Sequence, residues 1–312
     1  MNYEFDRLDI VGTGFTVLDR IYADGDFAAE ELGGSCGNVL ASLAMLQRRV
    51  APLIMLGMDD IGSRLIEEFE RAGADLRLVH RRWNLESPIV AQDLDTTLGQ
   101  HRFSFICRET NTDFPRYRPI EDGEGASAAS ALAACSVFYA DRLSGSILRA
   151  MEQAHSAGAL VYFEPSDVHE EFFERALEMA TIVKYSSERL GSATDYKVAH
   201  SAALAIRTHG AEGLEIAQGL RSIRCEAVPA ARILDTSGAG DMVSVGVIDM
   251  LLHCHRIPQK KLQIEDLIVG VAAGQTLAAA NCAFTGARGI FREMGARYAE
   301  GLLRRVSSNF VS

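Results

Sequence analysis

The sequence has a shortage of positive charge. Its 31 lysine and arginine residues stand against 42 aspartate and glutamate residues, which gives a formal net charge of −11 over 312 residues. Binding to nucleic acid or to an anionic membrane surface depends on clustered lysine and arginine. The composition therefore argues against both partners, although backbone amides could still hold a small anionic ligand.

Hallmarks of secreted and membrane proteins are also missing. The six cysteines form no CxxC pair, which is typical of reduced thiols in a cytosolic protein. The N-terminal segment MNYEFDRLDIVG carries charges where a signal peptide has an apolar core. The longest apolar tract, residues 266–284, is interrupted by Gln275, Thr276 and Asn281, so we expect a buried helix there instead of a membrane span. These features predict a cytoplasmic protein.

Several common site motifs are absent as well. The sequence contains no GxxxxGK[ST], GxSxG or HExxH pattern, so P-loop, nucleophile-elbow and zincin-type sites are not expected. The segment GTGFTV (12–17) has the first two glycines of a dinucleotide-binding fingerprint, but Val17 stands where the third belongs. A nucleotide site in this chain must therefore be built in another way.

Short apolar runs alternate with amphipathic patterns along most of the chain. Strands that are apolar on both faces and alternate with helices indicate a parallel sheet covered on both sides. We expect strands in residues 8–15, 50–58, 136–141, 159–165, 180–186 and 202–210, and helices near 37–48, 61–73, 146–157, 168–179 and 188–192. The pattern predicts one α/β domain over residues 1–312 with a doubly wound, mostly parallel sheet, which would bind ligands at the carboxyl ends of its strands.

Residues 15–33 and 76–107 break this alternation. They contain β-rich pieces such as LRLVHRR, PIVAQDL and HRFSFIC, without convincing helices between them. We expect antiparallel strands, set apart from the main sheet, that form a small β-sheet lid and exclude water from a cleft. Because the edges of such strands can pair between two copies, a homodimer through the lid is a further hypothesis.

The segment DTSGAGD (235–241) combines features that conflict at first sight. It follows a predicted strand, RILD, and opens the apolar helix MVSVGVIDMLLHC, whose first amides have no partner within the helix. Gly238, Ala239 and Gly240 leave those amides open to an anion, yet Asp241 adds a carboxylate at the same place. In a plain turn Asp241 would only complement the helix dipole, by about 0.3–1 kcal/mol. Phosphoryl transfer to a hydroxyl group requires both an anion hole and a proton acceptor, and so explains the combination.

Three other features are ambiguous when each is read alone. GGSCGN (33–38) could bring Asn38 close to a polyhydroxylated ligand, or could be a turn in which Asn38 caps a helix. RTHGAEG (207–213) follows a predicted strand, which places it at the same edge as DTSGAGD, but it could be a simple turn between strands. Asp19 could accept hydrogen bonds from sugar hydroxyls, or could lie on the surface of a strand.

Together these segments resemble the ribokinase-like (PfkB-type) carbohydrate kinases. DTSGAGDMVSVGVI (235–248) is similar to the C-terminal signature of that family, and GGSCGN with LGMDDIGSRLIEEFERAGAD (56–75) resembles its N-terminal signature region. RTHGAEG resembles the family's T-x-G-x-x-G nucleotide turn, and TGARG (285–289) its late Gly-Ala segment. The resemblance extends from residue 8 to residue 290 and keeps the family's order of motifs.

The resemblance implies a doubly wound α/β domain with a β-sheet lid and the MgATP-dependent phosphorylation of a sugar hydroxymethyl group. It implies that Asp241 is the catalytic base and that the other roles are distributed over an anion hole (Gly238, Ala239, Gly240), a sugar site (Asp19, Gly33, Gly34, Asn38) and a nucleotide site (Thr208, Gly210, Gly213, with Asn281 near the adenine). Some relatives also bind a monovalent cation such as K+, which here would lie near Asp235 and residues 283–289.

One segment departs from the family pattern. The family usually carries N-x-x-E here, linked to magnesium and the phosphates, whereas KYSSERLG (184–191) has Ser186 and Arg189 at those positions. Glu188, one position away, becomes the candidate metal ligand. EPSD (164–167) also differs from the Asp-Pro-Asn of many sugar-phosphorylating members.

Two alternatives to a sugar kinase stay open. The altered KYSSERLG segment suits a catalytically weak homologue that only binds a sugar or a nucleotide. The family also includes nucleoside kinases that act on adenosine-like substrates. Asp19, Asn38 and Arg102 favour a sugar, whereas Phe103 and Phe105 would suit the wall of a nucleoside site.

Overall fold

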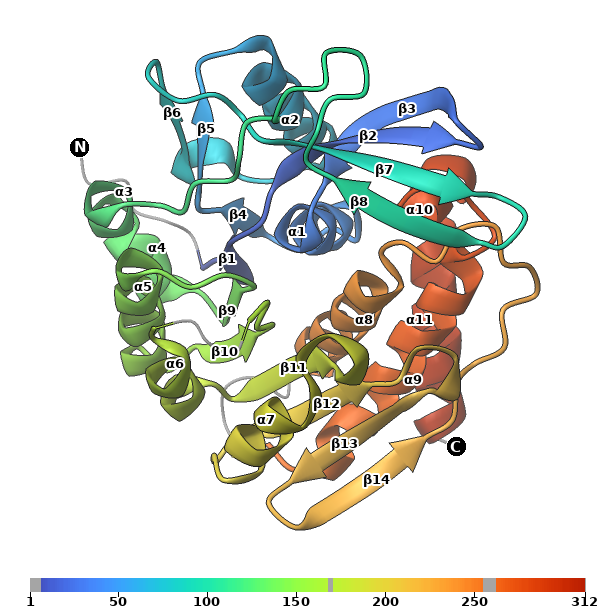
Figure 1. Cartoon of the computed structure of the whole chain (residues 1–312). Coiled ribbons are helices and arrows are strands. Elements are labelled where there is room, and N and C mark those ends of the chain that lie inside the picture. Colours follow the sequence, from blue (N-terminus) through green and yellow to red (C-terminus); the bar gives the residue numbers. More distant parts are fainter. Residues whose placement is uncertain (1–6, 168–170, 255–261, 312) are drawn as a thin grey trace.

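The main sheet has eight strands in the order β14-β13-β12-β11-β10-β9-β1-β4 (Figure 1). The computed structural model describes residues 7–167, 171–254 and 262–311. From β4 to β12 all neighbours are parallel, and β13 and β14 form an antiparallel hairpin at one edge. The strands are β1 (Ile10–Thr13), β4 (Val50–Pro52), β9 (Val137–Ala140), β10 (Leu160–Phe163), β11 (Ile182–Ser186), β12 (Leu204–Thr208), β13 (Leu214–Gln218) and β14 (Arg221–Cys225). The predicted α/β class and mostly parallel sheet are confirmed.

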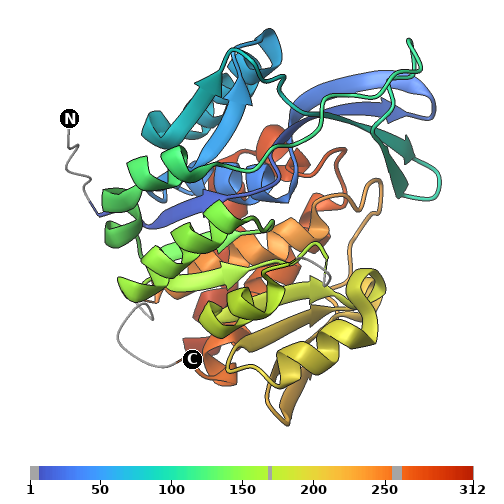
Figure 2. The same cartoon turned by 60° about the vertical axis from the view of Figure 1, so that its left-hand side comes forward.

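Helices cover both faces of this sheet (Figures 1 and 2). One layer contains α3 (Asp122–Ser127), α4 (Ala129–Ala134), α5 (Gly145–Ser156), α6 (Phe173–Met179) and α7 (Ser187–Ala199), and the other contains α1 (Ser35–Met45), α8 (Ala239–His253), α9 (Ile264–Asn281) and α11 (Ala296–Val311). Successive strand residues serve opposite faces, since Phe138 packs in the same core as Ile147 of α5 while Tyr139 packs with Val243 of α8. This arrangement confirms a doubly wound sheet.

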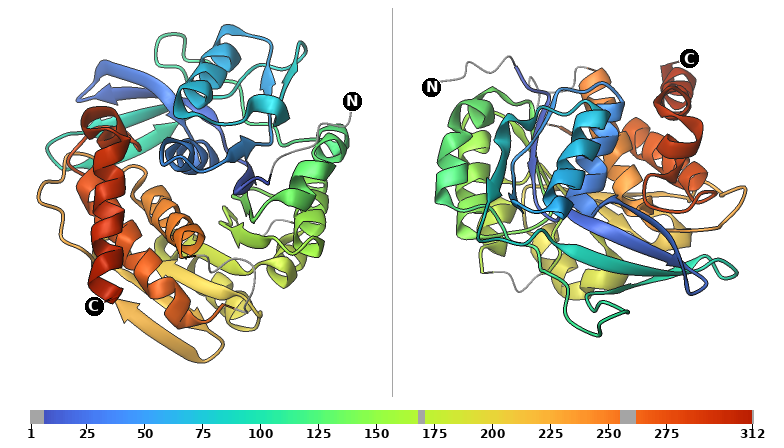
Figure 3. Two further views of the ribbon diagram at one scale, coloured as in Figure 1. Left: turned by 180° about the vertical axis from the view of Figure 1, so that it is seen from behind. Right: turned by 90° about the horizontal axis from the view of Figure 1, so that it is seen from above.

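The apolar tract near residues 266–284 forms α9, which packs between α8 and α11 (Figure 3). Close packing of α8 on α9 is permitted by Gly246 and Gly274, since a side chain at either would collide with the backbone of the other helix. The short α10 (Gly289–Met294) connects α9 to α11. None of the described helices is both long enough and apolar enough to cross a bilayer.

A separate four-stranded sheet, the lid sheet, lies beside the main sheet, with the order β3-β2-β7-β8. Its strands are β2 (Val17–Ala23), β3 (Asp26–Gly33), β7 (Ile89–Asp95) and β8 (Gln100–Ser104). We expected antiparallel pairing throughout, but β2 and β7 are parallel. Residues 34–88, which connect β3 to β7, are long enough for the crossover that parallel pairing requires.

The predicted strand at residues 50–58 is divided in two. Only β4 pairs with β1, whereas β5 (Ile54–Gly57) leaves the main sheet and pairs with β6 (Val79–Arg82). Pro52 has no amide proton to extend the ladder, and the amide of Leu53 makes the last bond, 2.8 Å to the carbonyl of Gly12. The LRLVHRR piece therefore lies outside the lid sheet, as a 3-10 turn (Leu76–Leu78) followed by β6, with α2 (Asp60–Ala72) packed nearby.

Other boundaries differ from expectation in smaller ways. The RILD piece before the DTSGAGD loop is not a strand, because the amides of Leu234 and Asp235 both donate to the carbonyl of Cys282 after α9. The helix expected at residues 168–179 is described only from residue 171, and its helical part is α6. Helix α7 runs well beyond the expected 188–192.

Candidate active site

The first turns of α1 and α8 meet at the edge of the main sheet. The side-chain amide of Asn38, in α1, donates a 2.8 Å hydrogen bond to the carboxylate of Asp241, in α8. Asn38 is buried and lies inside the helix, so it is not the N-cap; Gly34 takes that position. The Oδ1 atom of Asn38 is buried and has no partner among the described groups. It can therefore accept a hydrogen bond from a ligand.

Asp241 is a carboxylate whose protonation is balanced near neutrality. Burial and the negative charge of Glu164 raise its pKa to about 7, against the opposing effects of Lys184 and of the Asn38 hydrogen bond. A carboxylate with such a pKa can accept a proton from a substrate hydroxyl at neutral pH.

The loop in front of Asp241 has open amides. Gly238 adopts φ 71°, and a side chain there would collide with Ala287, so the position requires glycine. The amide of Ala239 donates a 3.3 Å bond to the carbonyl of Thr236, whereas the amides of Gly238 and Gly240 have no acceptor within the described parts of the chain. Two of the three predicted anion-hole amides are thus available, at the positive end of a helix dipole.

Asp235, the other aspartate of the loop, accepts hydrogen bonds on both of its carboxylate oxygens. Its Oδ1 atom accepts a 2.8 Å bond from the amide of Ser237, and its Oδ2 atom accepts bonds from the amide of Gly286 (2.8 Å) and the side chain of Gln92 (3.2 Å). Gln92 belongs to lid strand β7 and also bonds to the hydroxyl of Ser237. Asp235 therefore connects the DTSGAGD loop both to the segment after α9 and to the lid sheet.

The predicted sugar site contains a second buried carboxylate. Asp19, on β2, is 5% exposed, and its carboxylate has no hydrogen-bond partner among the residues that the structure describes. Burial, followed by the charge of Glu31 on the neighbouring strand, raises its pKa well above the usual range. A side chain at Gly33 would overlap this carboxylate, so the glycine makes room for it. Asp19 can accordingly bond to ligand hydroxyls.

The predicted nucleotide turn lies between β12 and β13. Thr208 ends β12, and Gly210 and Gly213 adopt φ 56° and 93°, conformations that favour glycine. The hydroxyl of Ser187 donates a 3.1 Å bond to the carbonyl of Thr208, which attaches this turn to the start of α7. Although the two strands are antiparallel, the turn still lies at the carboxyl end of β12.

Glu188 is the only predicted metal ligand. It is exposed, and its Oε1 atom is 3.7 Å from the point where a side chain would begin at Gly210. The described residues contain no group of three or more acidic, histidine or cysteine side chains that could hold a metal ion. Mg2+ usually binds enzymes through one or two carboxylates together with substrate phosphates and water. An exposed carboxylate beside the predicted nucleotide turn fits that mode.

Asn281 is buried and bonded entirely to its own loop. Its Oδ1 atom accepts a 2.9 Å bond from the amide of Ile290, and its Nδ2 atom donates to the carbonyls of Gly286 (3.3 Å) and Ala287 (3.2 Å). Asn281 thereby positions the segment that packs on Gly238. Contact between Asn281 and an adenine stays a prediction.

Two charged side chains that sequence reasoning did not assign lie behind Asp241. The ammonium of Lys184, on β11, is 3.1 Å from the carboxylate of Glu164, which follows β10. Both are at least nine-tenths buried. Glu164 also accepts a bond from the hydroxyl of Ser244 in α8. The available signal was a lysine inside an apolar strand and a glutamate at the end of the next one.

Asp141 is a third unassigned group at this edge. It follows β9, and its carboxylate accepts bonds from the amides of Phe15 (2.7 Å) and Cys36 (3.2 Å). Burial raises its pKa to about 6, although Arg142 and the amide bonds oppose the shift. Asp141 thus fixes the first turn of α1, which carries Asn38.

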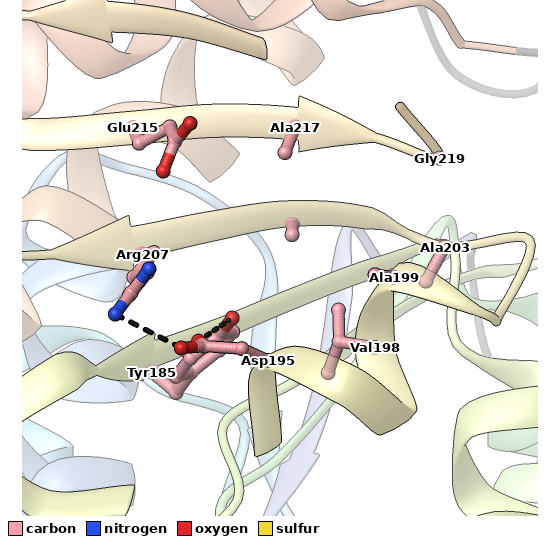
Figure 4. A pocket seen from close by; sticks show the side chains of 10 residues that line it. Tyr185, Asp195, Val198, Ala199, Ala203, Arg207, Glu215, Ala217 and Gly219 are labelled. Atoms are coloured by element: carbon pink, nitrogen blue, oxygen red, sulfur yellow. Dashed lines mark hydrogen bonds and ion pairs between the residues drawn. The ribbon is translucent and has the colours of Figure 1, made fainter. Parts of the chain in front are cut away.

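A cavity of about 150 Å3 lies elsewhere, between α7 and the face of β11–β13 (Figure 4). Asp195 in its wall accepts a 2.8 Å bond from the hydroxyl of Tyr185 and pairs with Arg207 at 2.9 Å. None of the predicted site residues lines it. This cavity is therefore separate from the site around Asp241.

Solved structures share this fold at low sequence identity. A fructokinase with bound ATP from Xylella fastidiosa has a TM-score of 0.75 and 19% identity, over 96% of this chain and 99% of that one. A ribokinase from Giardia lamblia has a TM-score of 0.76 and 13% identity, with the same coverage. Arabidopsis thaliana ribokinase complexed with ribose and ATP has a TM-score of 0.68 and 17% identity, again over 96% and 99%. These likenesses confirm the predicted fold.

Sequence comparison extends this result from the fold to the family. No curated protein sequence matches the chain. The family model described as pfkB family carbohydrate kinase matches residues 28–291, a range that holds most of the lid sheet, the DTSGAGD loop and the predicted nucleotide turn. The chain therefore belongs to the pfkB family and is a carbohydrate kinase, as its glycine-rich segments predict.

Proposed function

We propose that this kinase transfers the γ-phosphoryl group of ATP to a hydroxymethyl group of a sugar, with Asp241 as the general base. One observation carries the proposal: a carboxylate with a pKa of about 7 lies beside the open amides of Gly238 and Gly240 and is bonded to Asn38. A proton acceptor and an anion hole then meet at one point, which phosphoryl transfer to an alcohol requires.

The sugar would bind between the lid sheet and α1. Asp19 offers a carboxylate and Asn38 an Oδ1 atom, both buried and without protein hydrogen-bond partners among the described residues. Gly33 and Gly34 are required beside them, because a side chain at Gly33 would overlap the Asp19 carboxylate and one at Gly34 would collide with the backbone of Phe15. Buried acceptors of this kind favour a ligand with several hydroxyl groups. Asp241 in its ionised form would repel a second phosphate, so an unphosphorylated sugar is the expected substrate.

ATP would bind along the turn of Thr208, Gly210 and Gly213, with its γ-phosphoryl group at the open amides before Asp241. The bound ATP of the Xylella and Arabidopsis kinases, and the ribose of the latter, support this choice of substrates. Glu188 would hold Mg2+ together with the phosphates, and the bound ion would neutralise part of their charge. A K+ ion near Asp235 and a homodimer through the lid stay predictions.

The protein's part in the reaction follows from these positions. Asn38 holds the Asp241 carboxylate in place, and Asp141 holds the helix turn that carries Asn38. As the sugar oxygen attacks the γ-phosphorus, the bond from that phosphorus to the β,γ-bridging oxygen would break and ADP would leave with the bonding electrons. The hydroxyl proton would pass to Asp241, and the amides of Gly238 and Gly240 would hold the phosphoryl oxygens. The lid sheet, bonded to the loop through Gln92, would keep water from competing as the acceptor.

The test is to incubate the protein with MgATP and, separately, with D-ribose, D-fructose and adenosine, and to identify products by mass spectrometry. The proposal expects a sugar monophosphate and an equal amount of ADP. Phosphorylation of adenosine alone would establish a nucleoside kinase instead. Saturable ATP binding without any phosphorylated product across a wider sugar panel would identify a binding homologue and contradict the proposal.

A further inference from the structure

We propose that Lys184 is a further catalytic residue of this kinase, whose ammonium group binds the phosphoryl group during transfer. The inference rests on the proposed function, because it requires the phosphoryl group to lie at the amides of Gly238 and Gly240. No motif of the sequence assigns Lys184 a role. The role is inferred from the position of Lys184 in the fold: its distance from Gly240, its burial and the unused hydrogen-bond donors of its ammonium group.

Lys184 lies directly behind the anion hole. A side chain on Gly240 would begin 3.5 Å from its Nζ atom, so the ammonium and the open Gly240 amide face the same small volume. Lys184 is 6% exposed. Its backbone is held in position because β11 is a central strand, paired with β10 on one side and β12 on the other. An anion held by the Gly240 amide would therefore be within reach of a fixed positive charge.

The ammonium group has hydrogen-bonding capacity that the protein does not use. A lysine ammonium carries three donor hydrogens. In the described structure its one partner is the carboxylate of Glu164, at 3.1 Å. Unused donors of a buried cation are costly, and a phosphoryl oxygen is a suitable acceptor for them.

The cluster around Glu164 keeps the ammonium in place. Glu164 accepts a hydrogen bond from the hydroxyl of Ser244, and Ser244 in turn accepts a 3.2 Å bond from the hydroxyl of Tyr162. Tyr162 lies on β10, Glu164 directly follows that strand, and Ser244 lies on α8. A buried ion pair contributes little to net stability because of its desolvation cost, so stability alone does not account for this one. A cation held in advance beside the place where negative charge develops on the transferring phosphoryl group does account for the ion pair.

A weaker role would act only through Asp241. The positive charge of Lys184 lowers the pKa of Asp241. If this were its whole effect, loss of the charge would move the acid limb of the pH–rate profile to higher pH and leave the alkaline plateau unchanged. A direct role predicts a lower plateau at every pH.

The experiment compares Lys184→Met and Lys184→Arg with the unmodified enzyme, using D-ribose and D-fructose as acceptors. We expect Lys184→Met to lower plateau kcat by about 10²–10³-fold, as for loss of one donor to a transition state, and Lys184→Arg to recover part of it. In parallel, calorimetry with saturating sugar measures the affinity for ADP and for ADP with aluminium fluoride, a mimic of the transferring group. Lys184→Met should change ADP affinity by less than about threefold but remove the extra affinity for the mimic.

A plateau kcat within about threefold of the unmodified enzyme, with full affinity for the mimic, would overturn the inference. If Lys184→Met fails to fold, as circular dichroism would show, Lys184→Gln gives the same comparison with a neutral donor. Asp241→Asn separates the two levels of the account: loss of turnover in that variant, together with normal turnover in Lys184→Met, would refute the role of Lys184 alone. Normal turnover in Asp241→Asn would refute the proposed base.

Discussion

The side-chain amide of Asn38 donates a 2.8 Å hydrogen bond to the carboxylate of Asp241, although 203 residues separate the two in the sequence. The bond joins the first turn of α1, on the proposed sugar side, to the first turn of α8, on the proposed phosphoryl side. Because both helices also begin with a glycine at positive φ, the backbone of each start is accessible. Sugar and phosphate would thus meet at one carboxylate.

The rate should depend on pH through Asp241. A general base acts only when deprotonated, and its pKa in the folded protein is about 7, so kcat/KM should rise with pH and level off above that value. Glu164→Gln removes a charge that raises this pKa, and should shift the acid limb to lower pH. A pH–rate profile of both proteins checks this. An acid limb that stays at the same pH, or moves to higher pH, in Glu164→Gln would contradict the assignment of Asp241 as the base.

The same raised pKa predicts a gain in stability when Asp241 is neutralised. The folded protein holds a proton on Asp241 up to about pH 7, whereas an unfolded aspartate releases it near 3.8. Ionisation therefore removes stability as the pH rises between these values. Asp241→Asn should raise Tm by about 2–4 °C at neutral to alkaline pH and by much less near pH 4. Thermal unfolding of both proteins at the two pH values measures this, and an equal or lower Tm at alkaline pH would refute the shift.

The lack of a side chain at Gly33 should affect the KM for the sugar and leave the overall fold unchanged. A methyl group there would overlap the Asp19 carboxylate and displace it. Gly33→Ala should raise KM for the sugar by about tenfold or more, the effect of losing a hydrogen bond to a buried acceptor, with a smaller effect on ATP. Gly123→Ala is the matched control, because nothing lies within 4 Å of the added methyl. Equal KM values in the two variants would exclude Asp19 from the sugar site.

The bond between the lid sheet and the DTSGAGD loop should support turnover. Gln92, on β7, donates to both Asp235 and Ser237, so Gln92→Met leaves a buried carboxylate with one donor fewer. We expect kcat/KM to fall by about tenfold and hydrogen exchange in the loop to accelerate. Gln100→Met, on the exposed edge strand β8, is the control. If both variants behave like the unmodified protein, the lid does not position the loop.

Local sequence patterns predicted much of the fold and the chemical core of the site. DTSGAGD was enough to predict a role for Asp241 and its amides, because its residues are consecutive and their backbone requirements are local. The alternation of apolar runs and amphipathic patterns likewise predicted the α/β class and the separate lid segments. The matched family and the shared fold confirm the carbohydrate-kinase family and the α/β class, whereas the roles of Asp241 and its neighbouring amides stay predictions.

The remaining features depend on contacts that no local pattern contains. Lys184 and Glu164 meet only because β10 and β11 are neighbours in the sheet, and Asp141 reaches α1 across more than 100 residues. The parallel pairing of β2 with β7 and the division of the 50–58 strand also follow from chain connections, since either segment alone would pass for an ordinary strand. Long-range pairing, not residue type, was the missing information.

The most direct test of the central claim is the turnover of Asp241→Asn with MgATP and the accepted sugar. Loss of the proton acceptor should lower kcat by about 10²–10⁴-fold. Calorimetry should show ATP binding nearly unchanged in this variant, and Asp26→Asn, at an exposed carboxylate of the lid sheet, should behave like the unmodified enzyme. A kcat for Asp241→Asn within about threefold of the unmodified enzyme would contradict the account, because the reaction would then proceed without its proposed base.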